Sequence, residues 1–228
     1  ILHFLERHQS FLSCRLRRRR AAPAVVHQSK PRPPQPGHDE GLADEFRPQS
    51  RHVLLAQCYS RPFLARSAAA LLNGSTLYFG LRPQDWHGAG IDMVSGSRSL
   101  IKTALNGVVL SSRAKRVELA GSRLPDHEAV ALLGSFDTVD DTYGASETSK
   151  SYSTLWSLGV DGKPVATGKM RDSEIQVINA DGTPVAPGER GIVRVRNPYM
   201  VAGYLNDTSA SAEAFRDGWF YPGDVALV

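Results

Sequence analysis

The sequence contains little cysteine and no long hydrophobic run. Cys14 and Cys58 are the only cysteines among 228 residues. They form no Cys-x-x-Cys unit and no metal-ligand spacing, so neither a disulfide framework nor a zinc site is expected. No apolar stretch approaches the roughly 18 residues that a transmembrane helix needs. A secretory signal is also not expected, because Glu6, Arg7 and His8 directly follow the apolar start. We therefore expect a cytoplasmic protein with reduced thiols and no membrane span.

The rest of the composition is ordinary, with one local excess of charge. Hydrophobic residues make up 41% of the chain and charged residues 22%, as in a soluble globular protein. The net charge of +4 depends on five arginines within residues 15–20. The remainder therefore gives no indication of a nucleic-acid groove. One alternative stays open: the chain could be a basic interaction protein that acts through Arg15–Arg20.

The chain is predicted to contain three regions. Residues 1–52 are rich in proline and arginine and poor in apolar residues, which predicts a segment that is disordered or foreign to the fold. Residues 53–154 predict a partial α/β subdomain, and residues 155–228 a β-rich subdomain punctuated by glycine and proline. Because the chain begins with Ile1 rather than Met, we expect a fragment.

Strand and helix patterns alternate in the middle region. We expect short helices in 53–72, a strand at 90–94, a helix at 97–110, a strand at 117–120, a helix at 125–133 and a strand at 139–142. Such alternation indicates an α/β sheet, with functional loops where the strands end. Residues 155–203 are then expected to form a small antiparallel β unit, and Asp207 or Thr208 to begin a short helix that ends near Gly218.

Three short motifs carry the functional signal. Residues 143–147 read Tyr-Gly-Ala-Ser-Glu, residues 203–205 read Gly-Tyr-Leu, and residues 218–224 read Gly-Trp-Phe-Tyr-Pro-Gly-Asp. Their order and spacing resemble the adenylate-forming (AMP-dependent synthetase and ligase) superfamily, which includes acyl-CoA synthetases and peptide-synthetase adenylation domains. The resemblance covers roughly residues 86–228. It implies part of the large N-terminal domain of such an enzyme, ending before the hinge.

The resemblance implies ATP-dependent activation of a carboxylic acid as an acyl-adenylate, usually followed by thioester formation. The expected class is therefore an AMP-forming acid–thiol ligase that uses ATP/AMP and Mg²⁺. Its partners would be a small-molecule carboxylic acid and a thiol, either CoA or the pantetheine of a carrier protein. Such a site needs a metal ion and donors for the phosphates. The incomplete match leaves a second alternative, a non-catalytic remnant with at most weak adenylate binding.

The resemblance also assigns roles to residues. Ser146 and Glu147 are the expected catalytic residues, with Ser146 facing the α-phosphate and Glu147 binding Mg²⁺, which usually takes one or two carboxylates. Tyr143 is expected to place its ring against adenine, and Gly144 to let the backbone pass close to the ligand. Asp224 matches the aspartate that accepts hydrogen bonds from both ribose hydroxyls, as a carboxylate with two oxygens can.

Other parts of the family pattern match less well. Gly121, Ser122 and Arg123 resemble the turn that flanks adenine, although one glycine is lost and Arg123 replaces proline. Pro222 stands where the family often has threonine. The segment 203–205 is expected to be structural rather than catalytic. No segment matches the Ser/Thr/Gly-rich phosphate loop that ends in Pro-Lys.

Overall fold

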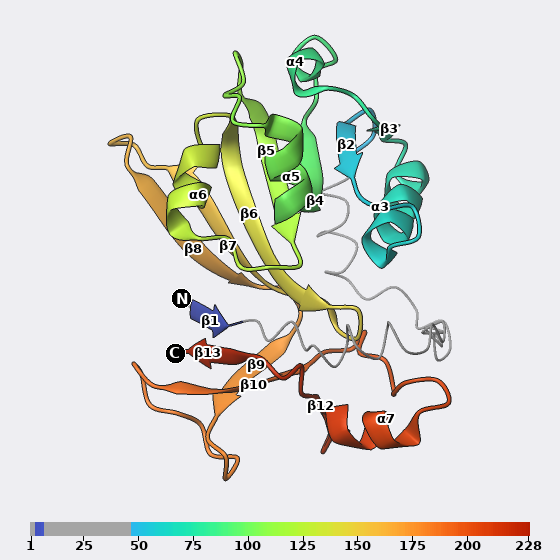
Figure 1. Ribbon diagram of the computed structural model, residues 1–228, viewed down its shortest axis with the longest axis vertical. Helices are drawn as coiled ribbons and strands as arrows, with labels where there is room; N and C mark the ends of the chain where they lie inside the picture. Colours follow the sequence, from blue (N-terminus) through green and yellow to red (C-terminus); the bar gives the residue numbers. More distant parts are fainter. Residues whose placement is uncertain (1–2, 7–46) are drawn as a thin grey trace. The chain divides into compact units, whose positions relative to one another are not determined.

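The structure is a computed structural model that describes residues 3–6 and 47–228 (Figure 1). Most of the segment 1–52, which was predicted to be disordered or foreign, lies outside the described residues, including Arg15–Arg20. Only residues 3–6 and 47–52 of that segment are described. The described chain forms two compact units. Residues 47–142 and 154–167 form the first, and residues 143–153 and 168–228 belong to the second. We call them the α/β unit and the β unit.

The α/β unit is built on parallel strands. These are β2 (Arg51–Leu55), β3 (Thr76–Tyr78), β4 (Met93–Ser97), β5 (Ala114–Ala120) and β6 (Phe136–Ala145). They pair in the order β3-β2-β4-β5-β6, every pair parallel. β7 (Ser149–Leu158) and β8 (Pro164–Met170) follow β6 in the same sheet. The link between β6 and β7 is too short for a crossover, so β7 runs antiparallel to β6.

Helices connect the parallel strands. They are α3 (Arg61–Leu72), α4 (Pro83–Trp86), α5 (Arg98–Leu105) and α6 (Asp126–Leu132). Local sequence explains their ends: the hydroxyls of Ser60 and Ser97 each accept a hydrogen bond from a first-turn amide at 3.3 Å. Pro125 opens α6, and Asn106 closes α5 in the left-handed conformation with φ of 45°.

The two faces of the parallel sheet differ in chemistry. One face presents Val53, Val94, Val117 and Val139, which are paired across neighbouring strands and fully buried. This face packs against Trp86, Ile101, Leu105, Leu124, Ala129, Leu133 and Phe136. Figure 1 shows α5 and α6 on the same side of the sheet. Burial of these apolar side chains is the main driving force for folding of this unit.

The opposite face of the parallel sheet is polar but still buried. Glu118 and Asp140 are paired in register on β5 and β6 and are 2% and 0% exposed. Arg66 of α3 forms an ion pair with Glu118, and Arg116 forms one with Asp140. Parallel sheets are normally covered on both faces, and charges at such depth require partners. These ion pairs explain how a buried face can carry carboxylates.

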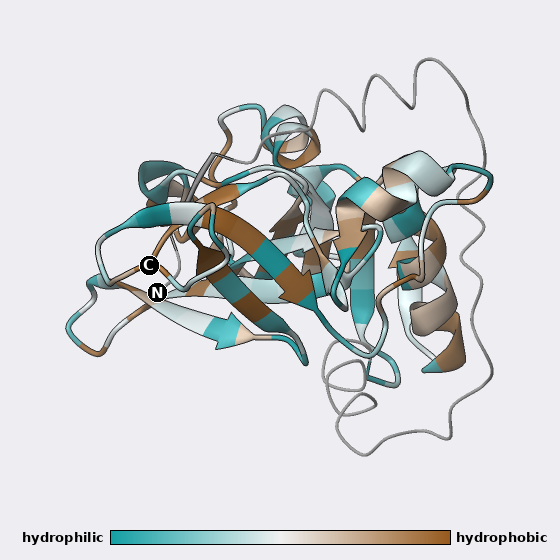
Figure 2. Cartoon of the chain, turned by 90° about the horizontal axis from the view of Figure 1, so that it is seen from below, coloured by the Kyte–Doolittle hydropathy of each residue, from teal (hydrophilic) through white to brown (hydrophobic). Residues whose placement is uncertain are grey.

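The β unit is antiparallel. Its strands are β1 (His3–Glu6), β9 (Glu174–Ile178), β10 (Arg190–Arg196), β11 (Phe215–Arg216), β12 (Trp219–Phe220) and β13 (Val225–Leu227). β10 is its central strand and pairs with β9, β12 and β13. Val193 and Val195 alternate with Arg194 and Arg196, so the valines enter a core with Tyr143 and the arginines lie on the other face. Figure 2 shows hydrophobic and hydrophilic residues alternating along strands of the chain.

The predicted fold class, an α/β layer followed by an antiparallel β unit, is confirmed. The prediction for 53–72 is partly wrong, because the run begins with strand β2 and only the alanine-rich part, α3, is helical. The strand at 139–142 is longer than predicted, since β6 continues through Tyr143 to Ala145. Asp207 does begin a helix: its carboxylate accepts a hydrogen bond from the amide of Ala210 at 2.9 Å. That helix, α7 (Thr208–Ala214), ends earlier than expected.

One ion pair links the start of α5 to the first turn of α6. Nε and Nη2 of Arg98 donate to the two carboxylate oxygens of Glu128, each at 2.6 Å. The hydrogen bond from Arg98 holds the pKa of Glu128 below its ordinary value. A lowered carboxyl pKa stabilises the fold above the unfolded-state pKa of about 4.3. That stability is lost as pH falls through the folded-state pKa.

We expect Glu128→Gln to lower the free energy of unfolding by roughly 1 kcal/mol at neutral pH, with the deficit shrinking as pH falls toward about 3. Urea denaturation of the wild type and Glu128→Gln at neutral pH and at about pH 3 measures this deficit. Asp137→Asn is the control, because it removes a more exposed pair with Arg113 at 3.2 Å. An equal deficit for Glu128→Gln at both pH values would contradict the ion-pair explanation.

Candidate functional site

The candidate site is built on the turn between β6 and β7. Tyr143 and Gly144 lie near the end of β6, and Ser146 and Glu147 lie in the turn that follows. A Cβ atom on Gly144 would collide with the backbone carbonyl of Ser149. The close approach of the two strands therefore requires glycine here. This is a structural reason for Gly144, in addition to the predicted approach of a ligand.

The first and third motifs meet at a buried hydrogen bond. The hydroxyl of Tyr143 donates to Oδ2 of Asp224 at 2.6 Å, across 81 residues of sequence. Both side chains are buried, with 4% of Tyr143 and 7% of Asp224 exposed. The main-chain carbonyl of Asp224 also accepts from the amide of Val193 on β10, at 2.9 Å. The predicted adenine-side tyrosine and ribose-side aspartate are therefore direct neighbours.

The first and second motifs meet at the turn itself. The hydroxyl of Tyr204 donates to Oε1 of Glu147 at 2.8 Å, across 57 residues. The amide of Val201 donates to the carbonyl of Glu147 at 3.0 Å, and Nδ2 of Asn197 donates to the carbonyl of Thr148 at 2.7 Å. The segment 197–204 thus holds both the backbone of the turn and the predicted metal ligand. Sequence reasoning missed Asn197 and placed Tyr204 among structural residues.

The predicted adenine turn lies in the other unit. Gly121, Ser122 and Arg123 follow β5, and Gly121 has a φ of 95° that favours glycine. The amide of Leu124 donates to Oδ2 of Asp141 at 3.3 Å, which connects the end of this turn to β6. The tyrosine–carboxylate contacts belong to the β unit. The role of Gly121, Ser122 and Arg123 beside adenine therefore stays a prediction.

The Glu147 carboxylate in the turn is chemically suited to a Mg²⁺ ion that is also coordinated by nucleotide phosphates. No group of three or more His, Cys, Asp or Glu within the described part of the chain could hold a metal ion. Mg²⁺ needs no such group, because it usually binds one or two carboxylates together with phosphates and water. The half-buried Glu147 carboxylate has one oxygen hydrogen-bonded to Tyr204 and retains acceptor capacity on the other. Glu147 can thus act as a single protein ligand.

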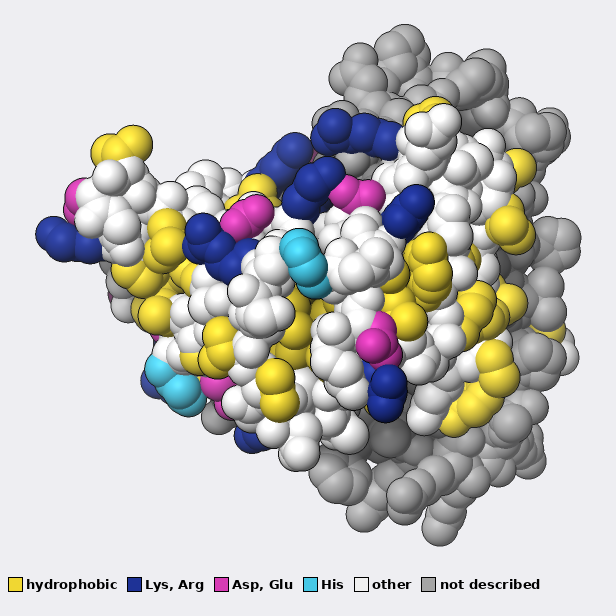
Figure 3. All heavy atoms as spheres, turned by 90° about the horizontal axis from the view of Figure 1, so that it is seen from above, with side chains coloured by type: hydrophobic (Ala, Val, Ile, Leu, Met, Phe, Trp, Pro, Cys, Tyr) yellow, Lys and Arg dark blue, Asp and Glu magenta, His cyan; other side chains and the backbone are white. Residues whose placement is uncertain are grey.

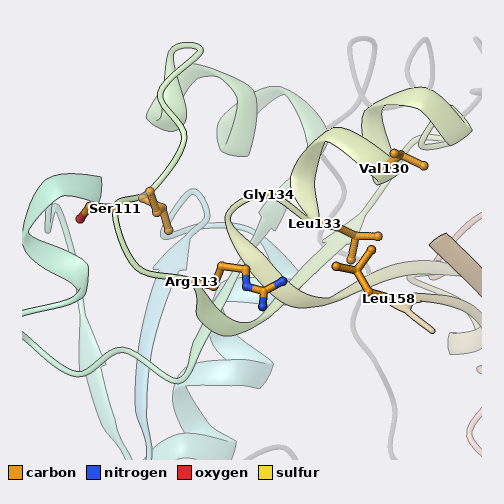
Figure 4. A pocket seen from close by; sticks show the side chains of 7 residues that line it. Ser111, Arg113, Val130, Leu133, Gly134 and Leu158 are labelled. Atoms are coloured by element: carbon orange, nitrogen blue, oxygen red, sulfur yellow. The ribbon is translucent and has the colours of Figure 1, made fainter. Parts of the chain in front are cut away.

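Two surface hollows are lined by residues other than the predicted site residues, although Gly218 of the third motif lines one of them. One, of about 480 Å³, lies in the α/β unit and is lined by Leu110, Ser111, Arg113, Val130, Leu133, Gly134 and Leu158. Figure 4 shows the Arg113 side chain reaching toward Leu133 and Leu158. The other, of about 380 Å³, lies in the β unit and is lined by Asp172, Glu174, Arg196, Asn197, Pro198, Met200 and Gly218. None of the predicted site residues lines either hollow.

The described surface mixes charges of both signs. On the face drawn in Figure 3, Lys and Arg side chains lie next to Asp and Glu side chains. Among the described helices, none is long and apolar enough to cross a membrane.

Comparison with known proteins identifies relatives over part of the chain. No family model matches it. The 2-succinylbenzoate–CoA ligase of Geobacillus kaustophilus (strain HTA426) is 33% identical over 131 residues, which cover 49% of this chain and 26% of the ligase. The enzyme of the same name from Geobacillus sp. (strain WCH70) is 36% identical over 96 residues, covering 40% and 18%. The chain thus spans about a quarter or less of the length of these relatives.

Solved structures share the fold. The crystal structure of IdnL1 superposes with a TM-score of 0.68 and 22% identity, covering 82% of this chain and 44% of that one. O-succinylbenzoate coenzyme A synthetase from Bacillus subtilis, in complex with AMP, gives a TM-score of 0.63 and 21% identity, covering 82% and 40%. This is the fold of part of the large domain of adenylate-forming enzymes. Over part of its length, the chain is similar in sequence to acid–thiol ligases of the adenylate-forming, AMP-dependent ligase superfamily, which the three motifs also resemble.

The Tyr143–Asp224 hydrogen bond predicts a stability effect. Tyr143→Phe keeps the ring but removes a donor from a buried carboxylate. We expect the free energy of unfolding to fall by roughly 1–3 kcal/mol, as measured by urea denaturation. Tyr59→Phe is the control, because Tyr59 is 77% exposed and its hydroxyl should contribute little. Wild-type stability in Tyr143→Phe would show that this hydrogen bond does not support the fold.

Proposed function

We propose that the chain carries the nucleotide-binding part of an AMP-forming acid–thiol ligase. In this reaction ATP activates a carboxylic acid as an acyl-adenylate, and a thiol then takes the acyl group. The observation that supports the proposal is the meeting of the three motifs, through the Tyr143–Asp224 and Tyr204–Glu147 hydrogen bonds. Shared descent with acid–thiol ligases adds the reaction class.

Tyr143 and Asp224 form the proposed nucleoside side of the site. Asp224 would accept hydrogen bonds from the ribose hydroxyls, and the ring of Tyr143 would lie against adenine. Because the Tyr143 hydroxyl already donates to Oδ2 of Asp224, a diol that uses both oxygens would replace that donor. The buried carboxylate then stays hydrogen-bonded with and without ligand, which avoids the cost of an unsatisfied charge.

Glu147 and Ser146 form the proposed phosphate side. Glu147 would hold Mg²⁺, which when bound neutralises phosphate charge and orients the pyrophosphate leaving group. The Ser146 hydroxyl would donate to the α-phosphate. The structure of the Bacillus subtilis synthetase with ATP and magnesium ion supports this choice of ligands. The names of the relatives, ligases of 2-succinylbenzoate and ferulate to CoA, support an aromatic or similar small carboxylic acid and favour CoA over carrier-protein pantetheine.

The nucleoside role of Asp224 predicts weaker binding in Asp224→Asn. Loss of charge-assisted hydrogen bonds of about 1.5–3 kcal/mol corresponds to roughly a 10- to 100-fold weaker affinity for AMP. Isothermal titration calorimetry on the full chain measures it. Asp161→Asn is the control, since the Asp161 side chain is 55% exposed and lies in the α/β unit. Equal affinity in Asp224→Asn and wild type would remove Asp224 from the site.

The phosphate role of Glu147 predicts a metal-specific defect. We expect Glu147→Gln to weaken ATP binding in the presence of Mg²⁺ while metal-free AMP binding stays unchanged, because the amide is a poor Mg²⁺ ligand. Pyrophosphate exchange into ATP, with a panel of aromatic, fatty and amino acids, then tests turnover. Acid-dependent exchange that falls by about 10²–10³ in Glu147→Gln would favour an active ligase. Nucleotide binding with no exchange would favour the non-catalytic remnant.

A further inference from the structure

We propose that Tyr204 is a positioning residue for Glu147: its hydroxyl holds the carboxylate in the orientation that receives the magnesium ion. The inference rests on the proposed function of Glu147 as metal ligand. It gives a specific role to a side chain that the sequence presents as part of a structural segment.

The Tyr204 hydroxyl is placed to orient the Glu147 carboxylate through a direct hydrogen bond. The phenol oxygen lies 2.8 Å from Oε1, in a partly buried setting. A phenol is a neutral donor, so the hydrogen bond leaves the negative charge of Glu147 in place for the metal. A glutamate in a turn otherwise samples several rotamers, and fixing one before metal arrives reduces the entropy lost on binding. Outer-shell partners of metal ligands typically contribute 10- to 100-fold in metal affinity.

Tyr204 is itself held in place by the β unit. Its ring meets Phe215 edge-to-face, with centroids 5.5 Å apart, and its amide donates to Oγ of Ser211 in α7 at 2.7 Å. A Cβ on Gly203 would lie 2.9 Å from the same Oγ, which explains the glycine before the tyrosine. The phenol is therefore fixed from the α7 side, independently of any ligand.

The backbone of the turn has its own supports. The amide of Val201 and the side chain of Asn197 donate to the carbonyls of Glu147 and Thr148. Removing only the Tyr204 hydroxyl should leave these contacts and the Phe215 contact intact. Tyr204→Phe is therefore a selective probe of the carboxylate's orientation.

The test compares binding of ATP with Mg²⁺ and binding of AMP without metal, by isothermal titration calorimetry on the full chain. For Tyr204→Phe we expect about a 10-fold loss of affinity for Mg²⁺-ATP and an AMP affinity within about 2-fold of wild type. Electron paramagnetic resonance of Mn²⁺, added with ATP, should show the same loss of bound metal. Tyr59→Phe, a far more exposed hydroxyl, should leave both affinities unchanged. In Glu147→Gln, adding Tyr204→Phe should cause no further loss.

Each outcome distinguishes the inference from the proposed function. If Glu147→Gln weakens Mg²⁺-ATP binding and Tyr204→Phe does not, the positioning role is wrong and the metal role of Glu147 stands. Equal losses of AMP and Mg²⁺-ATP affinity in Tyr204→Phe would reduce Tyr204 to a structural residue. If the wild type shows no Mg²⁺-dependent ATP binding, the proposed function fails and the inference fails with it. Ser211→Ala, which loosens the backbone anchor of Tyr204, is the second variant should Tyr204→Phe not fold, with the same expected selectivity.

Discussion

The close approach between Gly144 and the carbonyl of Ser149 is the constraint on which the candidate site depends. Any side chain at position 144 would meet that backbone, so the two strands can only approach this closely at a glycine. The tight return of the chain places Tyr143 on one side of the contact and Glu147 in the turn. Two residues that are close in sequence are thereby presented to different partners, Asp224 and Tyr204. Without this turn, the later motifs would have no common surface to reach.

The carboxylates of the parallel sheet and the carboxylate of the turn have donors of different charge. In the parallel sheet, Glu118 and Asp140 are paired with arginines. Such ion pairs offset the cost of burying charge, and the arginine largely cancels the negative potential that a cation would otherwise meet. At the turn, Glu147 instead accepts from a phenol, which satisfies one oxygen without neutralising the charge. A carboxylate kept negative and oriented suits cation binding, whereas one paired with a guanidinium suits packing. In this comparison, the candidate ligand Glu147 has a neutral donor, whereas the two sheet carboxylates have cationic partners.

The sequence predicted those elements well whose ends or faces are determined by residues close together in the chain. The cap at Asp207, the proline before α6 and the alternating valines of β10 each correspond to the structure. Strand β2 was missed because a short apolar run is compatible with helix or strand, and the alanine-rich α3 follows it directly. Only pairing with β3 and β4, which lie later in the chain, makes the run a strand. The extension of β6 through Tyr143 also depends on a neighbouring strand rather than on local sequence.

The candidate site also combines features that the local sequence predicts with contacts that depend on distant parts of the chain. Tyr143, Glu147 and Asp224 were predicted as site residues from their motifs, but their hydrogen-bond partners depend on how the β unit folds across 57 and 81 residues. Tyr204 was predicted to be structural, as part of the segment 203–205. Tyrosine, however, has an apolar ring and a polar end. In this chain the ring packs on Phe215 while the hydroxyl reaches Glu147. A residue with two chemically different ends can have a structural and a functional role at once. Here the packing of the Tyr204 ring fixes the hydroxyl that positions the Glu147 carboxylate.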